Sequence, residues 1–156
     1  MTLNVLQIVP GTSVDGPGLR TSIYLAGCTH RCPGCHNPAS WDFGGGTIYD
    51  VDELADIVIS HEFNVTLTGG DPLQTPDVDA LVHLLRRLKA AGLNVWAYTG
   101  YTLDEALKIQ RIRPVLELID TLVDGPYVEA LRDPELHFRG SSNQQIIDLH
   151  KSLDTK

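Results

Sequence analysis

The chain has 156 residues, 42% of them hydrophobic and 21% charged, which is the composition of an ordinary globular protein and excludes mainly disordered, collagen-like and disulfide-rich secreted classes. This length predicts a single domain over residues 1–156. Twelve Lys and Arg residues against twenty Asp and Glu residues give a net charge of −8, which repels phosphate backbones and anionic lipids, so we expect neither a nucleic acid nor a membrane as a partner.

The first ten residues, 1–10, have no basic stretch followed by a long apolar one, so they do not predict a secretion signal. Nor does any part of the sequence hold the run of about eighteen apolar residues that a transmembrane helix needs. We therefore expect a cytoplasmic protein. In that reducing compartment, clustered cysteines serve metal or redox chemistry more often than disulfide bonds.

The first half of the chain alternates strand-like and helix-like runs. A buried strand is predicted over 19–26, followed by a Cys/Pro/Gly-rich loop over 27–38. Apolar residues at helical spacing predict a helix over 50–61. A second strand is predicted over 63–68, and Gly69-Gly70 ends it.

The second half continues the same alternation. Thr75-Pro76 joins a capping hydroxyl to a proline and predicts a helix start, and Gly92 predicts the end of that helix. A third strand is predicted over 93–98. Residues 102–105 have the form of a capping box that opens a short helix, which Arg113-Pro114 should break. A fourth strand is predicted over 119–123, and the segment 136–149 is expected to add one more.

Strands separated by helices predict βαβ units, hence an α/β protein with a mostly parallel sheet. In such sheets ligands bind beyond the carboxyl ends of the strands. The loops at 27–38, 69–74, 99–102 and 124–126 all follow predicted strands. We therefore expect these four loops to meet around one site.

All three cysteines of the chain lie in the first of these loops, and four kinds of chemistry fit them. Cys32-Pro-Gly-Cys35-His36 has the pattern of covalent haem attachment, and Cys32 with Cys35 could form a redox dithiol, but both interpretations leave Cys28 without a role. Zinc would use all three thiolates with His30 or His36. A 4Fe–4S cluster usually takes four cysteines, so three would leave one iron open to a small chelating molecule.

The spacing Cys-x3-Cys-x2-Cys after a strand resembles the signature of radical S-adenosylmethionine (SAM) enzymes. Residues 14–20 (VDGPGLR), 27–35 (GCTHRCPGC), His36-Asn37 and Trp41 resemble the activases of glycyl-radical enzymes. Further motifs resemble one branch of these activases, the activating proteins of anaerobic (class III) ribonucleoside-triphosphate reductases: 68–73 (TGGDPL), 98–101 (YTGY), 122–125 (LVDG) and 139–144 (RGSSNQ). The resemblance covers nearly the whole chain, from 14 to 145.

This resemblance implies a partial, open (β/α) barrel of the radical SAM type and one 4Fe–4S cluster on Cys28, Cys32 and Cys35. It also implies SAM as the second cofactor. An electron from a low-potential donor such as flavodoxin or ferredoxin would cleave SAM to methionine and a 5′-deoxyadenosyl radical. That radical would take a hydrogen atom from a backbone glycine of the reductase, the protein partner.

The resemblance further implies which residues contact SAM, with no separate catalytic acid or base. Backbone atoms at Gly69-Gly70, where the missing Cβ atoms allow close approach, would hold the SAM ammonium group, with Asp71 as a further candidate. The full predicted set is Gly34, Cys35, His36, Gly69, Gly70, Asp71 and Thr99.

Several alternatives stay open at this point. His36 stands where this branch usually has tyrosine, and pyruvate formate-lyase activases have histidine there, so activation of that enzyme remains an alternative. A zinc-binding module without enzymatic activity is the alternative from another class. The sequence leaves undecided whether Asp124 or the segment 139–144 contacts SAM, a cation or the partner. Both a homodimer and a hetero-oligomer with the reductase remain open.

Overall fold

The computed structural model describes residues 1–28, 42–133, 135–136, 138–139 and 141–150. In this part of the chain seven strands form one sheet, in the order β3-β1-β2-β4-β5-β6-β7. The strands are β1 (Thr2–Thr12), β2 (Arg20–Leu25), β3 (Thr47–Asp50), β4 (Asn64–Gly69), β5 (Val95–Tyr98), β6 (Thr121–Asp124) and β7 (Gln145–Asp148).

The centre of the sheet is parallel and its flanks are antiparallel. β2 pairs with β4, β4 with β5 and β5 with β6 in parallel, whereas β1 pairs antiparallel with β2 and β3, and β7 pairs antiparallel with β6. β3 and β7 are the edges among the described strands, so the sheet is not closed. The predicted α/β class and parallel centre are confirmed, and so are the four predicted central strands.

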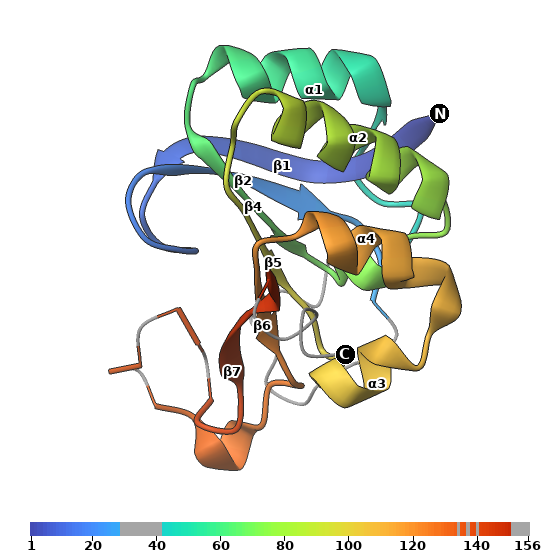
Figure 1. Cartoon of the computed structure of the whole chain (residues 1–156). Helices are drawn as coiled ribbons and strands as arrows, with labels where there is room; N and C mark the ends of the chain where they lie inside the picture. Colours follow the sequence, from blue (N-terminus) through green and yellow to red (C-terminus); the bar gives the residue numbers. More distant parts are fainter. Residues whose placement is uncertain (29–41, 134, 137, 140, 151–156) are drawn as a thin grey trace.

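Three helices cover one face of this sheet: α1 (Val51–Ser60), α2 (Val78–Ala90) and α4 (Arg113–Leu118), as Figure 1 shows. The short helix α3 (Leu103–Leu107) follows β5, and single 3₁₀ turns lie at η2 (Pro72–Gln74), η3 (Gln110–Ile112) and η4 (Glu129–Leu131). Within the described residues, no helix combines the length and the apolar character needed to cross a membrane.

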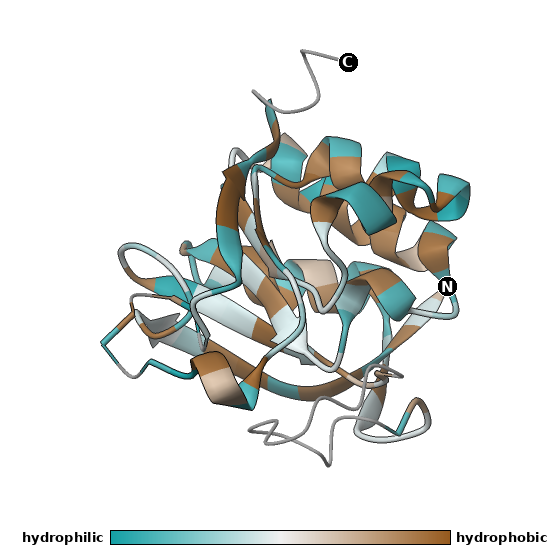
Figure 2. Ribbon diagram, turned by 90° about the horizontal axis from the view of Figure 1, so that it is seen from below, coloured by the Kyte–Doolittle hydropathy of each residue, from teal (hydrophilic) through white to brown (hydrophobic). Residues whose placement is uncertain are grey.

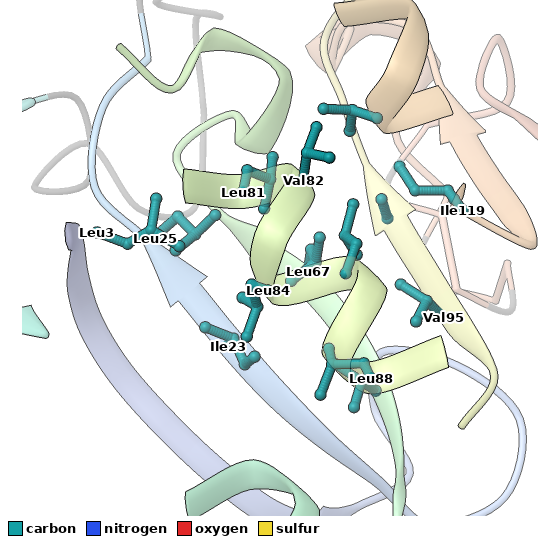
Figure 3. Close-up of a cluster of buried hydrophobic side chains, with 14 of the residues drawn as sticks. Leu3, Ile23, Leu25, Leu67, Leu81, Val82, Leu84, Leu88, Val95 and Ile119 are labelled. Carbon is teal, nitrogen blue, oxygen red and sulfur yellow. The ribbon is translucent and has the colours of Figure 1, made fainter. Parts of the chain in front are cut away.

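The core lies between the helices and the sheet. Leu81, Leu84 and Leu88 of α2 are fully buried, and Figure 3 shows them facing Ile23 of β2 and Leu67 of β4. The helices carry their hydrophobic residues toward the sheet and their hydrophilic ones outward (Figure 2). Because burial of such a side chain stabilises the fold by about 1.5–3 kcal/mol, this layer fixes the helices on the strands.

The start of α2 lies two residues after the predicted one. Asp77, not Thr75, caps the helix, and its carboxylate accepts the Ala80 N–H at 3.0 Å. Residues 72–74 form a 3₁₀ turn that is capped by Asp71 and closed by Thr75. The hydroxyl-proline pair at Thr75-Pro76 therefore belongs to the end of this turn, which has the same local signature as a helix start.

The prediction that Arg113-Pro114 breaks a helix was also wrong. α3 has already ended at Leu107, and Pro114 lies in the first turn of α4. A proline is tolerated there because the N–H that it lacks would have no partner within the helix.

The flanking strands β1 and β3 were not predicted. β1 alternates buried Leu3 and Val5 with less buried neighbours, but its register with β2 shifts between Val5 and Gln7 and again between Val9 and Thr12. These irregularities interrupt the two-residue period by which a strand is identified. β3 is a short and mostly exposed edge strand, so it carries little hydrophobic pattern.

Candidate functional site

The described ends of the four parallel strands are joined by hydrogen bonds, whereas residues 29–38 of the first predicted loop lie outside the described part of the chain. Gly70 N–H donates to the Leu25 carbonyl at 2.8 Å, which ties the end of β4 to the end of β2. Thr99 N–H donates to the Val123 carbonyl at 3.0 Å, and Gly125 N–H donates to the Tyr101 carbonyl at 2.7 Å. The carboxyl ends of β2, β4, β5 and β6 therefore form one continuous edge.

Cys28 is the one predicted cluster ligand within the described residues. It follows β2 at this edge, is partly exposed and does not belong to the buried hydrophobic core. The residue before it, Gly27, has a φ of 110°, and a Cβ at this position would overlap the ring of Phe43. Glycine is thus required for the turn that brings the chain to Cys28.

Four predicted site residues lie outside the described part of the chain: Cys32, Gly34, Cys35 and His36. Within the described part no group of three or more His, Cys, Asp or Glu side chains is arranged to hold a metal ion. The described Cys28 nevertheless fits an iron–sulfur site, because a partly exposed thiol in a strand-end loop can be deprotonated and reached by iron. Three thiolates are also the soft donors that such clusters take.

Gly69 and Gly70 follow β4, where the sequence placed them, and the structure adds a packing reason for the first. Gly69 has a φ of 101°, and a Cβ there would lie 2.6 Å from both the N and the O of Leu25. The missing side chain thus lets β4 approach the backbone of β2. Close approach of a ligand to this backbone remains a prediction.

Asp71 is buried, with 2% of its surface exposed, and it contacts the loops of both neighbouring strands. Its Oδ2 accepts the Thr99 hydroxyl at 2.8 Å and the Gly100 N–H at 2.9 Å. Its Oδ1 accepts the Leu73 N–H at 3.0 Å, and its own N–H donates to the Gly27 carbonyl at 2.7 Å. Two predicted site residues, Asp71 and Thr99, are therefore in direct contact.

Asp124 ends β6, two strands further along the sheet, and has a similar arrangement. It is 5% exposed, its Oδ2 accepts the Leu103 N–H at 2.8 Å and its Oδ1 accepts the Gln145 N–H at 3.0 Å. Asp124 therefore connects the first residue of α3 to the first residue of β7.

The segment 139–144 packs against the loop that follows β6. Asn143 donates through Nδ2 to the Pro126 carbonyl at 2.9 Å, and Gln144 donates through Nε2 to the Gly125 carbonyl at 3.0 Å. Ser141 is fully buried, and its hydroxyl accepts the Val128 N–H at 3.1 Å. The described residues of this segment thus support the strand-end edge through the 125–128 loop.

A second group of polar residues lies on the face of the sheet opposite the helices. Period-two alternation points Arg20, Ser22 and Tyr24 of β2 away from the core that Ile23 and Leu25 enter. We call this surface the polar face; it also includes Thr66, Thr68, Trp96 and Tyr98 of β4 and β5. The sequence analysis did not identify it, although the alternation RTSIYL in β2 could have indicated it.

Asp15, from the loop between β1 and β2, lies against the polar face. Its Oδ2 accepts the hydroxyls of Ser22 and Tyr24, each at 2.9 Å, and its carbonyl accepts the Thr66 hydroxyl at 3.0 Å. The motif 14–20, which the sequence placed near the site only by resemblance, therefore lies against strands that carry the site.

The polar face presents phenols and one buried cation. Burial raises the pKa of Tyr24 to about 12, with Asp15 adding to the rise, and burial and then Asp15 also raise the pKa of Tyr98. Both phenols are therefore hydrogen-bond donors at neutral pH. Arg20 is 2% exposed, donates to Thr66 and Asn94, and lies 5.6 Å from the centre of the Trp96 ring; burial lowers its pKa.

Comparison with known proteins shows which family the chain resembles. Residues 14–147 match the family described as "4Fe-4S single cluster domain". The chain is 39% identical over 153 residues to the anaerobic ribonucleoside-triphosphate reductase-activating protein of Haemophilus influenzae, with 92% of this chain and 97% of the relative covered. The protein of the same name from Escherichia coli (strain K12) is 38% identical over the same coverage, and that of Enterobacteria phage T4 is 30% identical over 92% of this chain and 93% of the relative.

Proposed function

Because this chain belongs to the family of the anaerobic ribonucleoside-triphosphate reductase-activating proteins, we propose that it activates such a reductase by radical SAM chemistry. The proposed reaction places a glycyl radical on the reductase. One electron cleaves the S–C5′ bond of SAM, which gives methionine and a 5′-deoxyadenosyl radical. This radical takes a hydrogen atom from a reductase glycine and becomes 5′-deoxyadenosine. The proposal places this reaction in the cytoplasm, with flavodoxin or ferredoxin as the class of electron donor.

The observation that carries the proposal is the hydrogen bond of 2.7 Å between the Asp71 N–H and the Gly27 carbonyl. It holds the backbone directly before Cys28 against the loop with the motif 68–73. The cysteines and this motif are predicted to hold the cluster and SAM. A reaction in which the cluster reduces SAM directly requires these two loops to lie side by side, and the hydrogen bond supports that requirement.

In this proposal the thiolates of Cys28, Cys32 and Cys35 hold a 4Fe–4S cluster, which supplies the electron when it is bound. Backbone groups at Gly69, Gly70 and Asp71 bind the amino-acid end of SAM, and Thr99 lies along the same pocket. Gly34 and His36 flank it. The residues of this chain therefore bind and orient the cofactors and exclude water from them, and none of them transfers a proton.

The polar face is where we place the glycine-bearing segment of the reductase. The sheet is open at its edges among the described strands, so this face is not enclosed as the inside of a full barrel would be. Asp15 and Tyr24 are partly exposed at this face, and a carboxylate and a phenol are groups that hydrogen-bond to a peptide backbone. Arg20, Ser22 and Thr66 are buried, so a reductase segment would contact the partly exposed residues of this face.

The test is anaerobic reconstitution with iron and sulfide, followed by incubation with SAM, a reductant and the reductase. We expect a glycyl-radical doublet on the reductase in electron paramagnetic resonance, and no doublet with Cys28→Ala. A doublet that forms on pyruvate formate-lyase and not on the reductase would show that the protein is an activase of pyruvate formate-lyase instead. A colourless protein that binds zinc and refuses iron would replace it with the zinc-module alternative.

A further inference from the structure

Asp71 connects three strand-end loops through contacts that its place in a binding motif does not require. Its Oδ2 accepts the Thr99 hydroxyl and the Gly100 N–H, its Oδ1 accepts the Leu73 N–H, and its N–H donates to the Gly27 carbonyl. We call these four hydrogen bonds the Asp71 clasp. They span the carboxyl ends of β2, β4 and β5 at distances of 2.7–3.0 Å.

The clasp is buried, which strengthens its hydrogen bonds. Asp71 is 2% exposed and Thr99 is 5% exposed, so water competes little for these hydrogen bonds. Hydrogen bonds to a carboxylate are also stronger than those between neutral groups. Removal of one partner leaves buried donors unpaired, so the loops have to rearrange to satisfy them.

The position of the clasp decides what its loss would disturb. Gly27 directly precedes Cys28, so the Asp71 N–H fixes the backbone next to the first predicted cluster ligand. The carboxylate fixes Thr99-Gly100, the strand-end loop predicted to border SAM. The same residue therefore determines the spacing between the cysteine loop and the Thr99 loop.

We propose that the Asp71 side chain is a positioning residue: it fixes the Thr99 loop to a strand end whose backbone is bonded to Gly27, and so sets the distance between the backbone just before Cys28 and the Thr99 loop and acts on SAM through them. This inference rests on the proposed function, because it assumes that SAM binds between these loops. It gives the Asp71 carboxylate a role within the protein, separate from direct contact with SAM.

Asp124 provides a matched control. It is a similarly buried carboxylate at the end of β6, two strands from β4 in the sheet, and it too accepts two backbone N–H groups, those of Leu103 and Gln145. Its contacts lead away from Cys28, toward α3 and β7. Loss of its charge should therefore destabilise the fold without altering the spacing set by Asp71.

The experiment is a double-mutant cycle on the SAM dissociation constant of the reconstituted protein, after the iron content of each variant has been measured. We expect Asp71→Asn to weaken SAM binding roughly tenfold, as removal of an outer-shell partner commonly does. Thr99→Val should weaken it too, Thr99→Ser should restore it, and the double variant should bind no worse than Asp71→Asn alone. Asp124→Asn should leave the dissociation constant unchanged.

Amide hydrogen exchange gives a readout that does not depend on SAM. Asp71→Asn and Thr99→Val should both speed exchange in 69–74 and 99–102, whereas Asp124→Asn should speed it around 103 and 145. If Asp71→Asn fails to fold, the Thr99→Val and Thr99→Ser pair carries the same comparison.

Several results would overturn the inference. Additive effects of Asp71→Asn and Thr99→Val would show two independent contacts with SAM. Weak binding by Asp71→Asn with unchanged Thr99→Val would make Asp71 a direct ligand. If Asp124→Asn weakened SAM binding as much as Asp71→Asn does, the effect of Asp71→Asn would come from a general loss of stability and not from positioning. Failure of the wild-type protein to bind SAM would instead remove the proposed function, and this inference with it.

Discussion

At the scale of single residues, glycines set how closely the backbones approach at the site edge. Gly69 is the clearest case, since its φ of 101° and its place against Leu25 both exclude a side chain. From the sequence, glycine was expected here because a backbone without a Cβ lets a ligand approach closely. The structure adds the packing reason, which depends on a contact between two strands 44 residues apart in the chain, Leu25 and Gly69.

Gly69→Ala should lower the free energy of unfolding by about 1–3 kcal/mol, because alanine adds both backbone strain and an overlap with Leu25. Gly92→Ala is the control: its φ is 79°, but a Cβ there meets nothing within 4 Å. Urea unfolding of the two variants measures the difference. An equal loss in both would show that the contact with Leu25 contributes nothing.

Asp71 and Thr99 illustrate how far prediction of the site could go. Their motifs placed both residues in strand-end loops, and the parallel order of the strands placed those loops side by side. The hydrogen bond between the two side chains could not be predicted, because it depends on which way each side chain turns within its loop. The polar face was missed because the alternation in β2 was interpreted only as a buried strand, although the resemblance had placed the motif with Asp15 near the site.

At the scale of elements, local signals predicted helix existence well and helix starts less well. The capping box at Thr102 and Glu105 is present in both of its halves, so α3 begins where expected. α2 does not, since Thr75-Pro76 closes a 3₁₀ turn and Asp77 caps the helix. The two candidate caps lie two residues apart, and the tertiary burial of Thr75 decides between them.

Asp77→Ala should lower the free energy of unfolding by about 0.5–2 kcal/mol, because it removes the side chain that accepts the Ala80 N–H. Asp79→Ala is the matched control, since Asp79 lies exposed in the same first turn and is not the cap. Thermal or urea unfolding followed by circular dichroism measures both. A larger loss with Asp79→Ala would place the important charge in the turn and not at the cap.

At the scale of the whole molecule, Asp120 joins elements at the end of the sheet opposite the site. Lys89 at the end of α2 donates to its Oδ2, as does Val95 N–H of β5, and the His150 ring contacts its Oδ1 at 2.6 Å. Burial raises the pKa of Asp120, but the hydrogen bonds from Lys89, His150 and Val95 outweigh burial and leave that pKa below its ordinary value. The carboxylate therefore stabilises the fold in its charged form.

The lowered pKa of Asp120 predicts that the protein loses stability in acid. A carboxyl group whose pKa is lower in the folded state stabilises the protein above its unfolded pKa of about 3.9, and the contribution disappears as the pH falls through the folded value. Asp120→Asn should therefore be less stable than wild type at pH 7, with a difference that narrows below about pH 4. Urea unfolding of the metal-free proteins over this range measures it. A constant difference at every pH would contradict the account.

The overall architecture was predictable in its centre and not at its margins. The βαβ alternation indicated β2, β4, β5 and β6 and their parallel order, because buried strands and amphipathic helices leave strong periodic signals. The antiparallel strands β1 and β3 leave weak periodic signals, because register shifts in β1 and exposure of β3 remove the two-residue alternation of hydrophobic residues. The curvature of a radical SAM barrel was expected from resemblance alone and remains a prediction.

In the proposed reaction, this protein moves a hydrogen atom from a reductase glycine to a fragment of SAM. The direct test uses reductase made with deuterated glycine, incubated anaerobically with the reconstituted protein, SAM and a reductant. Mass spectrometry should find one deuterium in the 5′-deoxyadenosine that is released as the glycyl radical forms on the reductase. Unlabelled 5′-deoxyadenosine alongside that radical would contradict it.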